Sequence, residues 1–382
     1  MSEDFKNKLK AYQEGRLSSE EQTAVEQEME KMEAYQAYLE ELIQNDSDRN
    51  ISTPDLKQEA KIIRKGKWKA RFTTALTLLG FGLLATILSG IMTSLFYGWG
   101  ENDRMTMYKD AVSSAIAISQ PNVEARLSAD SHFFFNMDLH GNLIKQIGGK
   151  KNAVGEFSQH FLLAQPGLET KTWFEGDMEM GRFLYPGELG ADSTREWNRL
   201  EKLPEGTVAE AFISFNRLFT TDELLALFKD KNLVPAWFAV DTGVEQKKDY
   251  VLYPIGFPYS PLWHADDMET TSFSETKQGL LGGSTVSKTS SSPSIKAYGS
   301  GDVRDANFMK TLHLLQTYEP IAKKIVPFLK LDESIAYLEK NGVKIYGVVV
   351  TGPTKEVLKL RQESWISSAQ VGKVQLWNWE DR

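Results

Sequence analysis

Cysteine is absent from this chain of 382 residues, and histidine is scarce. Without a thiol the chain has no disulfides, no thiolate zinc ligands and no cysteine nucleophile. The histidines show no metal-binding spacing, and no GxSxG, P-loop or dinucleotide-binding motif is present. The five histidines are His132, His140, His160, His264 and His313. We therefore predict that the protein is not an enzyme and has no catalytic residue, metal or cofactor.

Charged residues are missing from one long stretch, residues 72–98, which reads FTTALTLLGFGLLATILSGIMTSLFYG. About 20 apolar helical residues cross a hydrocarbon core of about 30 Å. The alternative, a buried core helix, rarely runs this far without a polar face. The stretch therefore predicts one transmembrane helix.

The flanks of this stretch differ in charge, and the difference predicts its orientation. Seven basic residues precede it between Lys57 and Arg71, whereas Glu101 and Asp103 follow it. Since basic flanks stay cytoplasmic, we expect residues 1–71 inside the cell and 99–382 outside, in a single-pass membrane protein. An outer domain without disulfides fits the surface of a Gram-positive cell. The net charge of −8 argues against direct binding of nucleic acid.

Residues 4–43 read as two amphipathic helices, the first ending at Gly15 and the second starting from a capping box formed by Ser18 and Glu21. Apolar side chains recur at intervals of three and four, which places them on one face. The residues predicted to bind a partner are Leu9, Tyr12, Leu17, Val25, Met29, Met32, Tyr35, Leu39 and Leu42.

The polar face of the same segment is acidic, with eleven acidic residues between Glu14 and Asp48 against Arg16 and Lys31. A domain of about 40 residues rarely buries such an apolar stripe alone. A solvated helix face is one interpretation. The combination of stripe and acidic face on a membrane-tethered segment favours docking onto a basic cytoplasmic protein.

The pattern LKAYQEGRLSSEEQTAVEQEMEKMEAYQAYLEEL resembles the N-terminal anti-sigma domain that binds extracytoplasmic-function (ECF) sigma factors. In many such domains a zinc ion is held by His-x3-Cys-x2-Cys. The matching positions in this chain are Glu28, Met32 and Tyr35, which cannot form a zinc site. The resemblance therefore implies a metal-free version of the domain.

The outer region reads as an α/β (α+β) domain. We expect a helix over 104–119 and a hairpin over 132–147 that turns near Asp138 to Asn142. Two strand-helix-strand units, one over 208–242 and one over 343–379, lie about 133 residues apart. Residues 277–301 are rich in Gly and Ser and predict a flexible insert. Aromatic residues here pack in the core or line a groove for a glycan or lipid headgroup: Trp173, Phe174, Phe183, Tyr185, Phe257, Tyr259 and Trp263.

The motifs IYGVVVTGPTKEVLKL and VGKVQLWNW resemble the sigma-factor regulator family of Gram-positive bacteria. The resemblance implies a membrane-bound anti-sigma factor that holds an ECF sigma factor of the sigma-M type and releases it on envelope stress. It also implies a second small membrane protein as partner. A membrane-anchored envelope enzyme, or a protein that binds cell wall or lipid headgroups, is the alternative.

These inferences together divide the chain into four parts. The predicted parts are a small all-α cytoplasmic anti-sigma domain (1–44), a linker with a basic juxtamembrane helix (45–71), the transmembrane helix (72–98) and an extracytoplasmic α/β domain (99–382). The partners are the sigma factor, bound through 1–44, and the lipid bilayer.

Overall fold

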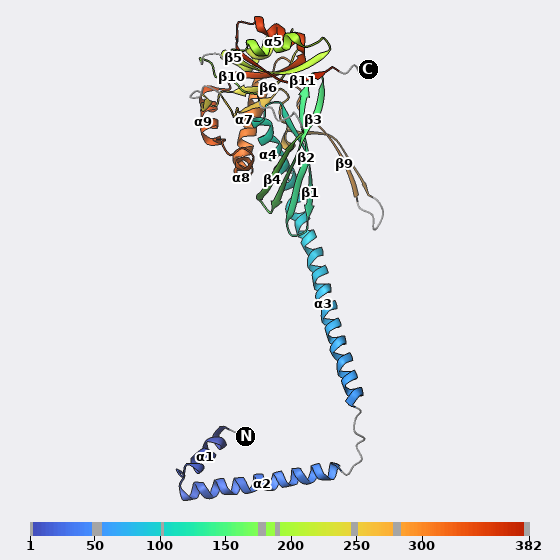
Figure 1. Ribbon diagram of the computed structural model, residues 1–382, viewed down its shortest axis with the longest axis vertical. Helices are drawn as coiled ribbons and strands as arrows, with labels where there is room; N and C mark the ends of the chain where they lie inside the picture. The colour runs from blue at the N-terminus through green and yellow to red at the C-terminus, as the bar shows by residue number, and fades with distance from the viewer. Residues whose placement is uncertain are drawn as a thin grey trace. The chain divides into compact units, whose positions relative to one another are not determined.

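The computed structural model describes residues 3–47, 56–100, 103–174, 181–187, 192–245, 251–277 and 284–377. The chain divides into two units, Met1–Leu83 and Leu84–Arg382. The first contains α1 (Glu3–Gln13), α2 (Ser19–Ser47) and most of α3 (Leu56–Gly98). The second contains two sheets, a separate two-stranded ribbon and the remaining helices (Figure 1). The arrangement of N-terminal helices, one long apolar helix and a sheet-rich C-terminal unit agrees with the predicted order.

The helices α1 and α2 are joined by the turn that the sequence predicts. Gly15 has a φ of +66°, a left-handed conformation that glycine adopts without steric cost. Its N–H donates to the carbonyl of Tyr12 at 3.1 Å, and the N–H of Arg16 donates to that of Ala11 at 3.0 Å. These two bonds form a Schellman motif, which ends α1 by satisfying its last carbonyl groups.

The predicted capping box at the start of α2 is confirmed. The backbone N–H of Ser18 donates to the carboxylate of Glu21 at 3.0 Å, and the N–H of Glu21 donates to the hydroxyl of Ser18 at 3.4 Å. The reciprocal bonds satisfy donors that a helix start leaves without partners. The helix then continues to Ser47, three residues beyond the predicted domain end at residue 44.

The basic segment and the apolar stretch form one continuous helix, α3. The predicted boundary between residues 71 and 72 therefore does not separate two elements. Residues 48–55, which include most of the predicted linker, lie outside the described residues. Within the described part of the chain, one helix is long and apolar enough to cross a membrane, over Ala60–Gly98.

The first sheet of the C-terminal unit is an antiparallel meander in the order β1-β2-β3-β4. The strands are β1 (Val123–His132), β2 (Asn136–Ile147), β3 (Lys150–Leu162) and β4 (Gln165–Trp173). In β3, buried Phe157 and Phe161 alternate with exposed residues, as a sheet with one covered face requires. The helix predicted over 104–119 is α4 (Arg104–Ser119), and it covers this sheet (Figure 1). Its Tyr108 ring stacks on Phe161.

The predicted position of the first hairpin turn is wrong. The turn comes at Phe133–Phe135, and residues 136–147 form a single strand. Gly141, expected near the turn, pairs with Leu127 inside the sheet. A Cβ at Gly141 would lie 1.9 Å from the carbonyl oxygen of Arg126. The glycine therefore permits a close backbone approach between strands rather than a turn.

The second sheet has the order β11-β5-β10-β6-β7 and is antiparallel throughout. The first predicted strand-helix-strand unit consists of β5 (Thr207–Phe219), α6 (Thr221–Phe228) and β6 (Val234–Val240). The second consists of β10 (Ile345–Pro353), α10 (Thr354–Lys359) with the 3₁₀ helix η3 (Leu360–Gln362), and β11 (Ile366–Leu376). Both predicted units are confirmed.

The two units interleave. Strand β10 lies between β5 and β6, and β5 lies between β10 and β11. Each unit is thus a split βαβ whose gap holds the first strand of the other, which is the ferredoxin-like arrangement. Between the units, β7 (Gly256–Pro258) adds an edge strand. Further helices are α5 (Thr194–Lys202), α7 (Gly301–Thr317), α8 (Glu319–Ile325) and α9 (Leu331–Asn341).

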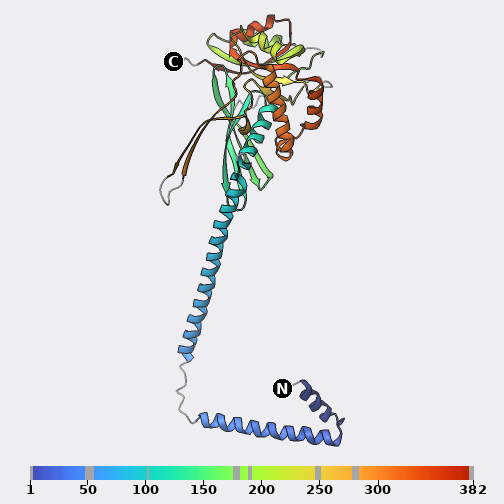
Figure 2. The same cartoon turned by 180° about the vertical axis from the view of Figure 1, so that it is seen from behind.

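The prediction of a flexible insert over 277–301 is wrong for part of that segment. Residues of β9 (Ser284–Ser291) pair with β8 (Glu269–Lys277) as an antiparallel ribbon, visible from both sides (Figures 1 and 2). Further on, buried Arg304 donates to the carbonyl groups of Lys296, Ala297 and Gly299. A buried guanidinium requires such acceptors, and they hold the end of the segment against α7.

Candidate functional sites

The predicted apolar stripe of the N-terminal unit is divided into two parts. Near the turn, α1 and α2 cover one another: Val25 is buried, and Leu9, Leu17 and Met29 are half-buried. The hydroxyl of half-buried Tyr12 donates to Oε1 of Glu26 at 2.8 Å, and this carboxylate raises the pKa of the phenol. These residues therefore hold the helical hairpin together.

The second part of the stripe is not covered by any described residue of the unit. Met32, Tyr35, Leu39 and Leu42 are all exposed, with Tyr35 at 64%. Ile43, also exposed, follows Leu39 by four residues and extends the same face, a continuation that the i, i+4 spacing would have revealed. An exposed apolar helix face is typical of a helix that docks in a groove.

Exposed carboxylates surround the uncovered apolar residues. On α2 these acidic residues are Glu28, Glu30, Glu33, Glu40 and Glu41. Lys31 is the basic residue among them. The surface therefore combines an apolar stripe with negative potential, which complements a basic partner and speeds its association. We call Met32, Tyr35, Leu39 and Leu42 the free stripe.

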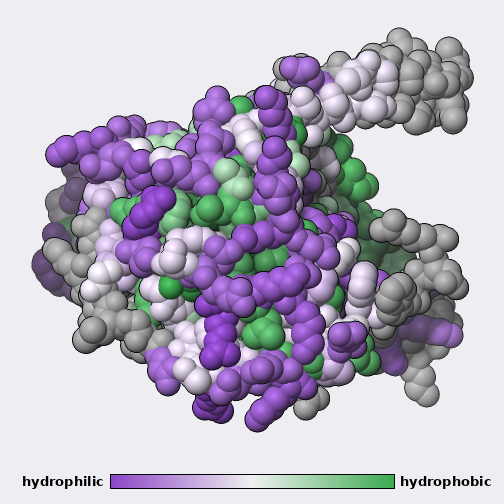
Figure 3. All heavy atoms as spheres, turned by 90° about the horizontal axis from the view of Figure 1, so that it is seen from above, coloured by the Kyte–Doolittle hydropathy of each residue, from purple (hydrophilic) through white to green (hydrophobic). Residues whose placement is uncertain are grey.

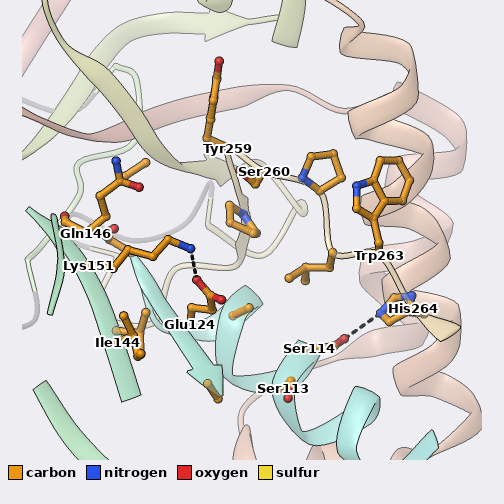
Figure 4. A pocket seen from close by; sticks show the side chains of 18 of the residues that line it. Ser113, Ser114, Glu124, Ile144, Gln146, Lys151, Tyr259, Ser260, Trp263 and His264 are labelled. Carbon is orange, nitrogen blue, oxygen red and sulfur yellow. Dashed lines mark hydrogen bonds and ion pairs between the residues drawn. The ribbon is translucent and has the colours of Figure 1, made fainter. Parts of the chain in front are cut away.

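A cavity of about 460 Å³ lies in the C-terminal unit between α4, the first sheet and the segment after β7 (Figure 4). Tyr259 and Trp263 line it, and so does the ion pair between Glu124 and Lys151. Asp110, on α4, has its carboxylate at the wall, where burial raises its pKa. The cavity thus offers aromatic rings and hydrogen-bonding groups together.

Beside this cavity, Nε2 of His264 lies 2.9 Å from the hydroxyl of Ser114, as Figure 4 shows. Burial lowers the pKa of the imidazole. Its Nδ1 is 3.7 Å from the carboxylate of Asp267, too far for the hydrogen bond that a catalytic triad needs. Ser114 is itself buried in the middle of α4. The geometry favours a structural bridge between α4 and the following loop.

His264, Asp266 and Asp267 are the one group in the described part of the chain with metal-binding proximity. Lys310 pairs with both carboxylates, at 2.8 Å from Asp266 and more closely to Asp267. Ser114 already bonds the imidazole. A cation would have to displace these partners, so the group fits an ion-paired loop better than a metal centre.

The aromatic residues, for which the sequence left core packing and a groove open, do not form one groove in the described part of the chain. Phe183 is completely buried against Phe212, Trp237 and Tyr346, in a small core of its own, and Phe257 is buried in the main core. Tyr259 and Trp263 alone among the predicted aromatic residues line the cavity. The sequence shows where the aromatic residues stand, but whether each one faces the core or the cavity depends on the tertiary structure.

Figure 3 shows one face on which hydrophilic side chains predominate, with apolar groups visible in the gaps between them. Scattered apolar exposure of this kind is normal. The surface in that view therefore adds no further candidate.

The comparisons with known proteins agree on one family. A model described as "Sigma factor regulator N-terminal" matches residues 60–152, and one described as "Sigma factor regulator C-terminal" matches 200–373. The "Probable anti-sigma-M factor YhdL" of Bacillus subtilis (strain 168) is 28% identical over 389 residues, which cover 99% of this chain and 100% of the relative. No solved structure matches.

The matched ranges follow the architecture. The N-terminal model begins at residue 60, inside α3, and extends into β3, whereas the C-terminal model takes in the interleaved sheet from β5 into β11. Helices α1 and α2 lie ahead of both models and within the alignment to the full-length relative. With both regulator domains in order on one polypeptide, the chain belongs to the sigma factor regulator family.

Proposed function

We propose that this protein is a membrane-bound anti-sigma factor that sequesters an ECF sigma factor of the sigma-M type through its N-terminal helical hairpin. The observation that carries the proposal is the free stripe, an exposed apolar face on α2. The N-terminal part of α2 packs against α1. Family membership and the full-length similarity to an anti-sigma-M factor support it.

In this mechanism the free stripe inserts into an apolar groove of the sigma factor, and the surrounding carboxylates face basic residues there. Binding lowers the concentration of free sigma factor. Each loss of about 1.4 kcal/mol in binding free energy raises the dissociation constant tenfold, so a modest change in the hairpin suffices for release.

We further propose that α3 spans the cell membrane with its N-terminus in the cytoplasm. Its N-terminal part carries the basic residues Lys61, Arg64, Lys65, Lys67 and Lys69, and no charged residue follows Arg71 within the helix. Residues 99–382 then lie outside the cell, where they receive an envelope signal or contact a second small membrane protein. They perform no catalysis in this scheme, and the chain needs no cofactor.

The test is recovery of the full-length chain, tagged at its C-terminus, from membranes of its own cell in mild detergent. An ECF sigma factor is expected in roughly stoichiometric amount, and deleting the gene should raise transcription from promoters of that sigma factor. If no sigma factor co-purifies and deletion leaves these promoters unchanged, the alternative of an envelope protein with an inert inner tail stands instead.

A further inference from the structure

The turn between β1 and β2 has an unusual composition for its backbone. Phe134 and Phe135 have φ angles of 61° and 58°, both left-handed. Positive φ in a hairpin turn is normally found at Gly, Asn or Asp, because the Cβ of other residues clashes with the backbone there. Leu163, in the neighbouring turn between β3 and β4, also has a positive φ, 56°. In these two turns the left-handed positions are therefore taken by bulky apolar residues, whereas a turn exposed to water normally has Gly or a polar residue there.

The backbone of these turns is hydrogen-bonded to side chains of α3. The N–H of Phe134 donates to Oγ of Ser89 at 2.6 Å, and the N–H of Phe135 donates to Oγ1 of Thr93 at 2.9 Å. The hydroxyl of Tyr97 lies 2.9 Å from the carbonyl oxygens of both Phe135 and Leu163, which share its one proton. Turns exposed to water need no such partners, whereas backbone polar groups in a bilayer must be satisfied by protein.

The level of these contacts along α3 is that of a membrane boundary. The uncharged stretch of α3 begins at Phe72. About 20 helical residues cross the hydrocarbon core, so the far boundary of the core lies near residue 91. Ser89 lies just inside that level and Thr93 just outside it. Between them, Gly90 faces the ring of Phe133, whose Cε1 would lie 3.0 Å from a Cβ at that position. The small residue lets the turn pack directly on the helix.

The side chains of the two turns are apolar and exposed, and a polar layer follows them immediately. Phe133, Phe134, Leu162 and Leu163 are all exposed, with Phe134 at 57%. One step further along the sheet, Asp138 lies 2.7 Å from Nδ1 of His160 and 3.0 Å from Nε2 of His132. An apolar tip beneath a polar belt is the pattern of a segment that enters a membrane interface from one side.

We propose that the two hairpin tips, residues 133–135 and 162–163, insert into the bilayer leaflet on the C-terminal side of α3, at the boundary between headgroups and acyl chains. The proposal rests on α3 spanning the membrane. The exposed Phe and Leu side chains then contact lipid acyl chains. The sheet β1–β4 is thereby in direct contact with the leaflet. Changes in lipid packing then act on β1–β4 as well as on the span.

The experiment uses the absence of cysteine. Single cysteines are introduced in the full-length chain at Phe134, at Leu84 within the span and at exposed Ser128, six residues before Phe134 on β1. Each is labelled with NBD and reconstituted in phosphatidylcholine/phosphatidylglycerol vesicles with doxyl-labelled lipid. We expect F134C to be quenched by lipid doxylated near the headgroup and to be at least about threefold less sensitive to iodide than S128C.

The three sites separate the two proposals. If L84C is quenched by lipid while F134C and S128C are equally accessible to iodide, the span stands and tip insertion is wrong. If L84C is also accessible to iodide, the membrane span and the topology in the proposed function fail together with the insertion. Quenching of both L84C and F134C, with S128C in water, is the supporting result.

A second pair of variants tests the role of α3. Thr93→Val removes the hydroxyl that accepts from Phe135 while keeping the side-chain shape, and Thr77→Val removes one that bonds only to its own helix, at the carbonyl of Thr73. In the F134C background, Thr93→Val should increase iodide quenching about twofold or more. Without the hydroxyl the N–H of Phe135 has no acceptor there, so the turn moves out of the bilayer towards water. Equal effects of the two variants would contradict the anchoring.

Discussion

The ammonium group of Lys145 lies 3.4 Å from Oε2 of Glu210, and both side chains are almost completely buried where β2 meets β5. Oε1 of the same carboxylate accepts from Nδ2 of Asn122 at 2.7 Å. One carboxylate thus joins β2 of the first sheet to β5 of the second. The relative placement of the two sheets depends on this network because a buried charge without partners is costly.

The first prediction concerns this ion pair. Glu210→Ala should reduce the free energy of unfolding by about 3–5 kcal/mol, because Lys145 is left buried without a counter-charge. The control is Glu319→Ala, which breaks an exposed pair with Lys323 and should cost less than about 1 kcal/mol. Denaturant unfolding of the detergent-solubilised chain, followed by near-ultraviolet circular dichroism, measures both. Similar losses for the two variants would contradict the network.

The second prediction concerns the free stripe. Leu39→Asp places a carboxylate in the proposed apolar contact and should weaken binding of the sigma factor at least about 100-fold, since burying an unpaired charge costs several kcal/mol. Ala37→Asp adds the same charge on the opposite side of α2 and is the matched control. Binding of purified sigma factor to the detergent-solubilised chain is the measurement. Unchanged affinity of the Leu39 variant would place the interface elsewhere.

The third prediction concerns metal. Because Glu28, Met32 and Tyr35 stand where related domains carry zinc ligands, binding of sigma factor should be unaffected by chelators. The same titration with and without EDTA, together with metal analysis of the purified chain, provides the check. Stoichiometric zinc that is removed along with binding activity would overturn the metal-free interpretation.

The fourth prediction is topological. Ser47→Cys and Ser291→Cys are small exchanges in a chain without native cysteine, one before and one after α3. In intact cells an impermeant maleimide should label S291C and leave S47C unlabelled until the membrane is permeabilised. The reverse pattern would place α1 and α2 outside the cell, where no sigma factor is present, and would exclude anti-sigma activity.

The fifth prediction concerns pH. Burial raises the pKa of Asp305 from 3.8 to about 6, although a hydrogen bond from Thr221 lowers it and the charges of Asp222 and Asp302 raise it. The folded chain therefore binds this proton more tightly than the unfolded chain. The resulting stability is complete below about pH 4 and is lost as the pH rises through about 6. Asp305→Asn should flatten this dependence and stabilise the chain at pH 7 by about 3 kcal/mol.

Thermal unfolding of the Asp305→Asn chain between pH 4 and 7 measures this effect. Asp230→Asn, at an exposed position, is the control and should leave the pH dependence unchanged. If the parent and the Asp305 variant lose stability in parallel over this range, the carboxyl group does not titrate as its burial implies.

Local chemistry in the sequence determined several features of this protein. A run without charge specifies an apolar helix, Gly15 permits a left-handed turn, and Ser18 with Glu21 caps the next helix, each through contacts between residues close in the chain. The two strand-helix-strand units were also predictable because their periodicity is local. The apolar side chains of α2 were identified by spacing, but their division into covered and free parts depends on where α1 packs.

Tertiary structure alone decided the rest. The turn falls at Phe133–Phe135 because Ser89 and Thr93, more than 40 residues earlier, bond its amides, and no local turn signal encodes that contact. Arg304 likewise orders part of a segment whose Gly and Ser content predicts flexibility. The interleaving of β5 and β10 pairs strands more than 120 residues apart. Strand pairing is set by such non-local contacts, whereas propensity and periodicity report only on neighbours in the chain.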